Sequence, residues 1–394
     1  MRNSIFLRID EKKIGLNQDW NSWIELWKKN VQFSSFDLNL ISPENSEDEI
    51  KTFFIKRKSN NRLKPKDIII NFTSPLSFFR VNGVMNGGYF YGNGGKIPSN
   101  WIGKFEEMDF ILVPSLWHLN LIEKIFPHKK IFKIPFPIAK VEKNFLNIPI
   151  PWIDVDLAIL KNDYFIQDLD SNDLISKSPI FLAETKYSTI DGFPIILSEW
   201  FRYKKKDGNG ILIFNGFLDS LSDIKIKSKI IDFLQMIYRL MRKNKIFTSN
   251  IYLIPKKLSK EESCSLLSIV DCMVSASHES TLITEKILEV LFYGKPIIIP
   301  SHSEMSDILP VNYPLTISCT VENCAFISEE DELPMTNYWF IQDEGTISEA
   351  LHHYCKITKN EKSYYAQNIW ENVNKFYSEN VIISEILNFL NGLK

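Results

Sequence analysis

The sequence predicts an α/β fold made of two doubly wound domains in series. Short β-rich runs alternate with amphipathic helical stretches along most of the chain, which is typical of βαβ units and a parallel sheet. The 394 residues are too many for one ordinary core, and the alternation restarts after a proline-rich interruption near residues 135–151. Hydrophobic residues make up 44% of the chain, which is enough to fill both cores.

The first domain is expected over residues 1–140. A helix is expected over 20–30, and a second over 115–126, where Ser115 follows a proline-ended strand and is expected to cap the helix. The predicted strands of this domain are 4–9, 36–41, 67–72, 109–114 and 130–135.

Residues 141–175 are expected to link the two domains, because Pro149 and Pro151 break any long element there. The second domain is expected over 176–345, and residues 346–394 form a helical tail whose apolar spacing predicts packing. The strands of the second domain are expected at 179–184, 210–217, 250–255, 270–277 and 296–301. Its helices are expected at about 193–206, 223–243, 259–268 and 284–293.

Composition and charge exclude several function classes. The formal net charge of -2 excludes a global electrostatic attraction to nucleic acid. No run of about 18 uncharged apolar residues is present to span a membrane, and the N-terminus meets a charge too early for a secretory signal. The 5 Cys show no zinc-binding spacing. We therefore expect a cytoplasmic protein without a metal or cofactor of its own.

The stretch "ESTLITEKILEVLFYGKPIIIP" (279–300) carries charged residues inside an apolar helix and strand. Its helix is expected to open at the carboxyl end of a buried strand, where free backbone N–H groups attract anions. Lys286 in the first turn is placed to neutralise a phosphate, and Glu285 or Glu289 is suited to accept both hydroxyls of a ribose. This combination describes a site for a nucleoside-diphosphate sugar. The alternative is a solvated, charged helix face.

Residues from about 250 to 301 resemble the donor-binding half of GT-B glycosyltransferases, above all those of family 4. Residues 109–138 and the C-terminal tail resemble further parts of these enzymes. The shared motif is carried here by Asp271, Ser277, Glu279, Glu289, Gly294, Lys295 and Pro296. The resemblance implies two Rossmann-like domains facing a cleft, with C-terminal helices that pack back on the N-terminal domain. It also implies a sugar transfer. The DxD-like run "DVD" (154–156) falls in the predicted linker, away from the candidate donor site.

The spacing of the two motif glutamates departs from family 4. Glu279 and Glu289 are ten positions apart, farther than in that family, and "LITEK" resembles the "Y.TEK" motif of GT-B fucosyltransferases. The family 4 resemblance implies a retaining reaction in which Glu279 meets the donor sugar. The fucosyltransferase resemblance implies an inverting reaction in which Glu285 binds the ribose and Lys286 the diphosphate. Whether Glu285 or Glu289 holds the ribose stays open.

The start of the second domain also departs from family 4, which has an Arg followed by Lys-Gly. This chain has Lys186 near the Arg position and Asp191-Gly192 in place of Lys-Gly. The resemblance therefore implies a thinner phosphate clamp made of Lys186, Lys286 and backbone amides. Two further candidates for the donor site are His278 and Thr284. The alternative for His278 is a purely structural role.

The N-terminal half is expected to carry the acceptor site. The stretch 82–101 is rich in glycine and aromatic residues, and Tyr89, Tyr91 and Asn93 are acceptor-side candidates because exposed rings stack on sugar faces. A long flexible loop is the alternative. Asp19, which follows the first strand, is a candidate catalytic base or else a helix N-cap.

The helix over 20–30 places Trp20, Trp23 and Trp27 on one face, with lysines beside them. Core packing is the first interpretation of this face, and peripheral contact with a membrane surface is the alternative.

Taken with the resemblance, these residues predict a metal-independent glycosyltransferase. It moves a sugar from a nucleoside-diphosphate sugar to a glycan, lipid-linked or protein acceptor. A non-catalytic GT-B subunit that partners an active transferase is the alternative, because the phosphate clamp is incomplete. A sugar-nucleotide epimerase shares the architecture, but no extra acid/base cluster supports it.

Overall fold

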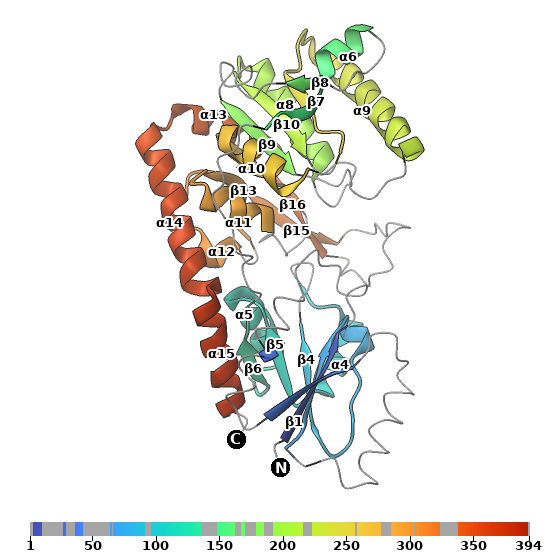
Figure 1. Ribbon diagram of the computed structural model, residues 1–394, viewed down its shortest axis with the longest axis vertical. Helices are drawn as coiled ribbons and strands as arrows, with labels where there is room; N and C mark the ends of the chain where they lie inside the picture. Colours follow the sequence, from blue (N-terminus) through green and yellow to red (C-terminus); the bar gives the residue numbers. More distant parts are fainter. Residues whose placement is uncertain are drawn as a thin grey trace.

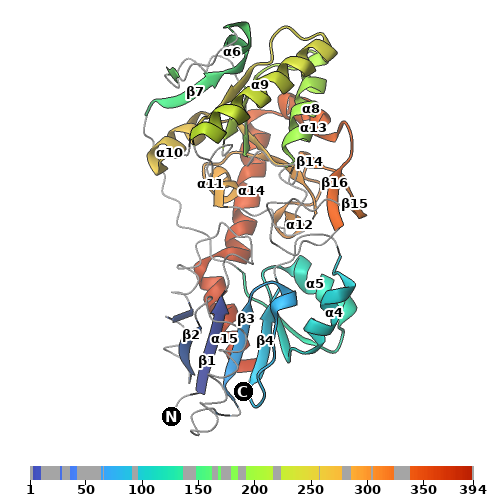
Figure 2. The ribbon, with the colours of Figure 1, turned by 90° about the vertical axis from the view of Figure 1, so that its right-hand side faces the viewer.

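The computed structural model describes residues 3–9, 27–28, 36–41, 64, 66–90, 96–135, 148–161, 167–169, 179–184, 192–215, 223–256, 258–276, 285–302, 305–323 and 338–392. Figure 1 shows an N-terminal and a C-terminal α/β half stacked along the long axis of the molecule. The helices α14 (Lys359–Tyr377) and α15 (Glu379–Gly392) run from one half to the other, and the turned view of Figure 2 shows the same arrangement.

The N-terminal half contains a six-stranded sheet in the order β2-β1-β3-β4-β5-β6, and every neighbouring pair is parallel. Strands β3 and β5 are buried at every position, as expected for a parallel sheet covered on both faces. The five strands predicted for this half are present. The strands are β1 (Asn3–Ile9), β2 (Phe36–Ile41), β3 (Ile68–Phe72), β4 (Met85–Tyr89), β5 (Phe110–Val113) and β6 (Lys130–Lys133).

Among the described residues, short helical segments accompany this sheet, including η1 (Pro75–Ser77), α4 (Ser99–Glu106) and α5 (Leu116–Ile125). The prediction for α5 is confirmed, because the Ser115 hydroxyl accepts the backbone N–H of His118 at 3.2 Å and caps the helix.

The glycine-rich stretch 82–101 contains a central strand and not only a surface loop. Strand β4 lies between β3 and β5 and is buried from its second residue onward. A Cβ atom on Gly87 would lie 2.1 Å from the ring of Phe110, and one on Gly88 would lie 2.3 Å from the ring of Phe78. These two glycines are therefore explained by aromatic rings that pack against the strand.

The C-terminal half contains an eight-stranded sheet in the order β14-β13-β12-β9-β10-β11-β7-β8. The first six strands in this order are parallel, and β7 and β8 join them antiparallel. The parallel strands are β9 (Ile180–Glu184), β10 (Ile211–Asn215), β11 (Ile251–Leu253), β12 (Cys272–Val274), β13 (Ile297–Pro300) and β14 (Thr316–Ile317). The five strands predicted for this half are among them.

The segment 141–175, expected as a linker, instead adds elements to the C-terminal sheet. It supplies β7 (Ile150–Asp154), α6 (Val155–Lys161) and β8 (Gln167–Leu169). The "DVD" carboxylates have structural partners there, since Asp154 accepts the N–H of Leu157 at 3.1 Å. Asp156 accepts the N–H groups of Ser249 and Asn250 at 2.7 and 2.9 Å.

The predicted helices of the second half are present within one or two residues of the expected bounds. Helix α11 ends in a Schellman motif, because Gly294 has φ 73° and Lys295 N donates to Val290 O while Gly294 N donates to Leu291 O. An antiparallel pair, β15 (Cys319–Asn323) and β16 (Tyr338–Gln342), lies beside the main sheet. The helices are α8 (Phe193–Lys205), α9 (Asp223–Asn244), α10 (Lys260–Ile269), α11 (Glu285–Phe292) and α12 (Met305–Ile308).

The C-terminal tail consists of α13 (Thr346–Lys356), α14 and α15. In this tail, α13 and α14 pack on the C-terminal half, and the last helix, α15, packs on the N-terminal half. The ring of Phe389 lies 5.1 Å from the rings of Phe110 and Phe132 and 6.0 Å from that of Trp27. Trp27 is fully buried in this core, which supports the packing interpretation for that tryptophan. No helix among the described residues is long and apolar enough to cross a bilayer.

Candidate functional site

Each parallel sheet has one point where the strand order reverses, and ligands of doubly wound folds bind outside the carboxyl ends of the strands at that point. In the C-terminal sheet the reversal lies between β9 and β12, because β10 and β11 extend the sheet on one side and β13 and β14 on the other. In the N-terminal sheet it lies between β1 and β3. The topology therefore marks two places where a ligand is expected.

The segments that follow β9 and β12 contain most of the predicted donor-site residues. Residues 185–191 and 277–284 connect these strands to α8 and toward α11. Several predicted residues lie outside the described part of the chain: Asp19, Tyr91, Asn93, Lys186, His278, Glu279 and Thr284.

Backbone packing brings α8 to the carboxyl end of β12. Gly192 precedes α8 with φ 71°, and a Cβ atom there would lie 1.9 Å from the carbonyl oxygen of Ala276, two residues beyond β12. Only glycine fits this approach. Gln342 at the end of β16 donates its side-chain amide to the same Ala276 oxygen at 2.9 Å. The start of α8, the residues just beyond β12 and the end of β16 therefore meet at the reversal point.

Helix α11 begins at Glu285, directly after the 277–284 segment. The backbone of Glu285 and Lys286 forms the first turn of α11, as predicted. Glu289 lies one turn later and is partly buried, whereas Ile287 and Leu288 are buried in the core. The amino end of α11 therefore lies at the carboxyl edge of the sheet, where the predicted anion site requires it.

Two other residues of the family 4 motif have structural contacts at the opposite edge of the sheet. Asp271 accepts the N–H of Ile180 at 2.8 Å and so ties the amino end of β12 to β9. Lys295 donates to Ser268 O at 3.3 Å, and burial lowers the pKa of its ammonium group. Both residues position strands, and neither faces the candidate donor site.

Tyr89 does not have the exposed ring that its predicted acceptor role requires. Its ring is 2% exposed and packs against Phe72, with ring centroids 4.8 Å apart, and its hydroxyl donates to Ile134 O at 2.9 Å. Tyr89 is therefore a core residue at the carboxyl end of β4, and sugar stacking by this ring is excluded.

The reversal point of the N-terminal sheet gathers polar groups that the sequence did not single out. Thr73 and Ser74 follow β3 and are 4% and 7% exposed, and their hydroxyls have no hydrogen-bond partner in the described structure. Arg8 near the end of β1 is also buried; its guanidinium lies 4.9 Å from the ring centroid of Phe79 and donates to Ser77 O at 2.8 Å. The sequence did contain one sign of this polar site, because an arginine is unusual inside an apolar strand such as "SIFLRI".

The carboxyl edges of the two sheets meet through α5 and α12. The N–H groups of Leu116 and Trp117, at the start of α5, donate to Asp307 Oδ2 of α12 at 2.8 and 3.3 Å. The imidazole of His302 stacks on Phe340 with ring centroids 3.6 Å apart, and Trp117 lies 6.2 Å from that same ring. Burial raises the pKa of the Asp307 carboxyl, although both hydrogen bonds oppose the shift.

Within the part of the chain that the structure describes, no cluster of three or more His, Cys, Asp or Glu side chains is arranged to hold a metal ion.

No protein-family model matches this chain, and no curated protein matches it. Solved structures do. HepE from Anabaena, in complex with UDP, is 9% identical with a TM-score of 0.57, and the match covers 99% of this chain and 100% of that chain. A glycosyltransferase from Rickettsia africae ESF-5 is 12% identical with a TM-score of 0.56, covering 100% of this chain and 98% of that chain.

TarM from S. aureus, in complex with Fondaparinux, alpha-GlcNAc-glycerol and UDP, is 13% identical with a TM-score of 0.51. The match covers 87% of this chain and 58% of TarM, so this chain spans less than two thirds of that protein. At such identities the likeness concerns architecture. The chain has the GT-B fold, with two parallel α/β halves and C-terminal helices that join them.

Proposed function

We propose that this chain is a glycosyltransferase that moves a sugar from a nucleoside-diphosphate sugar to a glycan, lipid-linked or protein acceptor, without a metal of its own. One observation carries the proposal. The motif that predicts a diphosphate-sugar site begins α11 at the reversal point of the C-terminal sheet, in a GT-B fold. HepE and TarM, which share this fold, were solved with UDP.

The proposed donor site uses the amino end of α11 for the diphosphate, with Lys286 as its cation. Glu285 or Glu289 accepts the hydroxyls of the ribose. In the retaining reaction favoured by the family 4 resemblance, Glu279 meets the donor sugar, and Lys186 and Lys286 stabilise the leaving diphosphate.

The proposed acceptor site is the reversal point of the N-terminal sheet. Buried hydroxyls of Thr73 and Ser74 are suited to exchange hydrogen bonds with a hydroxylated acceptor. The contact of Asp307 with the start of α5 brings this edge toward the donor edge. Such an arrangement would bring the donor sugar and the acceptor hydroxyl together for transfer.

A non-catalytic GT-B subunit is a second candidate, and one feature favours it. Gly192 keeps the close backbone approach to Ala276, but the residue before it is Asp191, an anion where family 4 has a lysine. Such a chain would retain the fold and bind a nucleotide without transferring a sugar.

The first test measures nucleotide binding by calorimetry and thermal shift with UDP, GDP, CMP, ADP and dTDP. We expect one nucleotide to bind, and we expect Lys286→Ala and Glu289→Ala each to weaken it about tenfold or more, because charge-assisted hydrogen bonds are lost. The control variants are Lys130→Ala and Glu349→Ala, which remove exposed charges elsewhere and should bind as the wild type does.

If no nucleotide binds at millimolar concentration, the proposal is wrong and the charges of α11 form a solvated face. If the nucleotide binds, the matching sugar nucleotides are then incubated with candidate acceptors. Release of the nucleoside diphosphate coupled to acceptor modification establishes the transferase. Binding without any release favours the non-catalytic subunit.

A further inference from the structure

Two apolar side chains protrude from the end of the C-terminal half that lies away from the N-terminal sheet. Phe247, three residues after α9, is 94% exposed, and Leu160 on α6 is 82% exposed. Both views show α6 and one end of α9 at this pole of the molecule (Figures 1 and 2). Asp156 of α6 holds the N–H groups of Ser249 and Asn250, so α6 is fixed to the loop that carries Phe247.

Exposed cations lie close to these apolar side chains in the sequence. Lys161 follows Leu160 and is exposed, and the last two turns of α9 with the residue after it contribute the exposed Arg239, Arg242, Lys243 and Lys245. No acidic residue occurs between Gln235 and Asn250. Tyr238 is 47% exposed, and the guanidinium of Arg242 lies 5.8 Å from its ring centroid. We call Leu160, Tyr238, Phe247 and these cations the α6–α9 surface.

The turn after α9 holds Lys245 in a strained conformation. Ile246 N donates to Met241 O and Lys245 N to Arg242 O, which is a Schellman motif with Lys245, at φ 56°, in the position that glycine usually takes. The turn directs Ile246 onto the core, while Phe247 stays in solvent. A glycine would relieve the strain but would lose the charge and leave the exposed phenylalanine without its neighbouring cation.

We propose that the α6–α9 surface binds an anionic lipid bilayer. Protruding apolar side chains enter the boundary between headgroups and acyl chains, and the flanking cations stay at the level of the phosphates. Leu160 has no ring to stack on bases, and it would gain little from a nucleic acid, whereas an acyl layer accepts both Leu160 and Phe247. The surface lies at the amino edge of the C-terminal sheet, where α8 and α9 end, so the candidate cleft at the carboxyl edge stays open.

The test is co-sedimentation of the full chain with phosphatidylcholine vesicles that contain or lack phosphatidylglycerol. We expect binding to the anionic vesicles, weakened by salt and weak on the neutral ones. Phe247→Ser should bind about tenfold more weakly or worse, with unchanged thermal stability because the ring contacts solvent. Val311→Ser is the matched control, since Val311 is a 91% exposed apolar residue outside this surface and should bind as the wild type does.

Lys245→Gly separates membrane binding from folding. It should raise the melting temperature by relieving the left-handed backbone of a non-glycine residue, yet weaken binding to anionic vesicles about fivefold by removing one cation. Equal binding of wild type and Phe247→Ser overturns the proposal. The proposal is also overturned if Phe247→Ser abolishes self-association of the chain, or its binding to a single-stranded oligonucleotide, and leaves vesicle binding unchanged.

Discussion

At the scale of single residues, the structural role of a glycine depends strongly on the residues that pack against it. The sequence "NGGY" fits a flexible loop that stacks aromatic rings on sugars, and equally a strand crossed by bulky rings. The structure shows the second case, with Phe110 against Gly87 and Phe78 against Gly88. Phe110 is far away in the sequence, so the pattern around Gly87 contains no sign of it.

Gly87→Ala should destabilise the protein by about 1–3 kcal/mol, because the added methyl group overlaps the fully buried ring of Phe110. Gly103→Ala is the matched control. Gly103 is exposed within α4 and has nothing within 4 Å of an added Cβ, so alanine should stabilise the chain by about 0.5–1 kcal/mol. Urea unfolding of both variants measures this difference, and a Gly87→Ala variant as stable as the wild type would contradict the packing explanation.

At the scale of elements, segments with strong periodicity were predicted, whereas several strands, β4 and β7 among them, were not. Helices α5, α8, α9, α10 and α11 follow their apolar spacing, and the parallel strands follow their Ile- and Phe-rich runs. Strand β4 was missed because its glycines lower strand propensity. Strand β7 was missed because Pro149 precedes it and Pro151 lies within it. Only Ile153 and Asp154 pair with β11, so Pro151 interrupts no pairing on that side.

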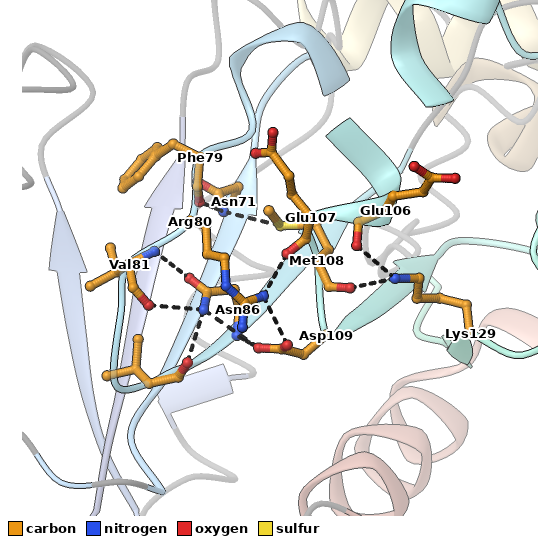
Figure 3. A network of polar contacts seen from close by, with 11 residues as sticks. Asn71, Phe79, Arg80, Val81, Asn86, Glu106, Glu107, Met108, Asp109 and Lys129 are labelled. Carbon is orange, nitrogen blue, oxygen red and sulfur yellow. Dashed lines mark hydrogen bonds and ion pairs between the residues drawn. The ribbon is translucent and has the colours of Figure 1, made fainter. Parts of the chain in front are cut away.

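The connection from β3 to β4 is held by side-chain hydrogen bonds that no periodicity reveals. Figure 3 shows Asn86 bonded to the backbone of Val81 and to Asp109, while Arg80 bridges Glu107 O and Asp109. The Asn71 amide donates to Phe79 O and Gly87 O in the same network. This network fixes the chain between Thr73 and β4, and so the segment of the proposed acceptor site.

Asn86→Ala should cost about 1–3 kcal/mol, because Asn86 is fully buried and the N–H of Val81 would lose its acceptor at 2.7 Å. Asn120→Ala, on the exposed face of α5, should change the stability little or raise it. Denaturant unfolding compares the two variants. Hydrogen exchange should further show faster exchange at Val81 in Asn86→Ala, and unchanged exchange there would refute the role assigned to the network.

At the scale of the whole molecule, the strand order of the two sheets locates the candidate site better than residue patterns in the sequence do. The reversal points follow from strand order, and α11 begins at one of them as the motif predicted. The contact between the halves was not predictable, because Asp307 and Leu116 are 191 positions apart and no sequence pattern pairs them. The hydroxyls of Thr73 and Ser74 were missed because their burial is a tertiary property.

The junction between the halves should make stability depend on pH through Asp307. Burial raises the pKa of this carboxyl, so the folded chain takes up its proton more readily than the unfolded chain. Its contribution to stability is therefore fully present below the ordinary aspartate pKa and is lost as pH rises through the raised folded value. Asp307→Asn keeps an oxygen acceptor for the α5 N–H groups and removes the buried charge.

Asp307→Asn should therefore melt close to the wild type at pH 4 and about 2 °C higher at pH 7. Asp232→Asn, an exposed position on α9, should follow the wild type at both pH values. Differential scanning calorimetry of the three chains across this range measures the effect. The opposite result would be an Asp307→Asn variant that becomes less stable than the wild type as pH rises. It would mean that the charge on Asp307 stabilises the junction, through the amino end of α5, by more than its burial destabilises it.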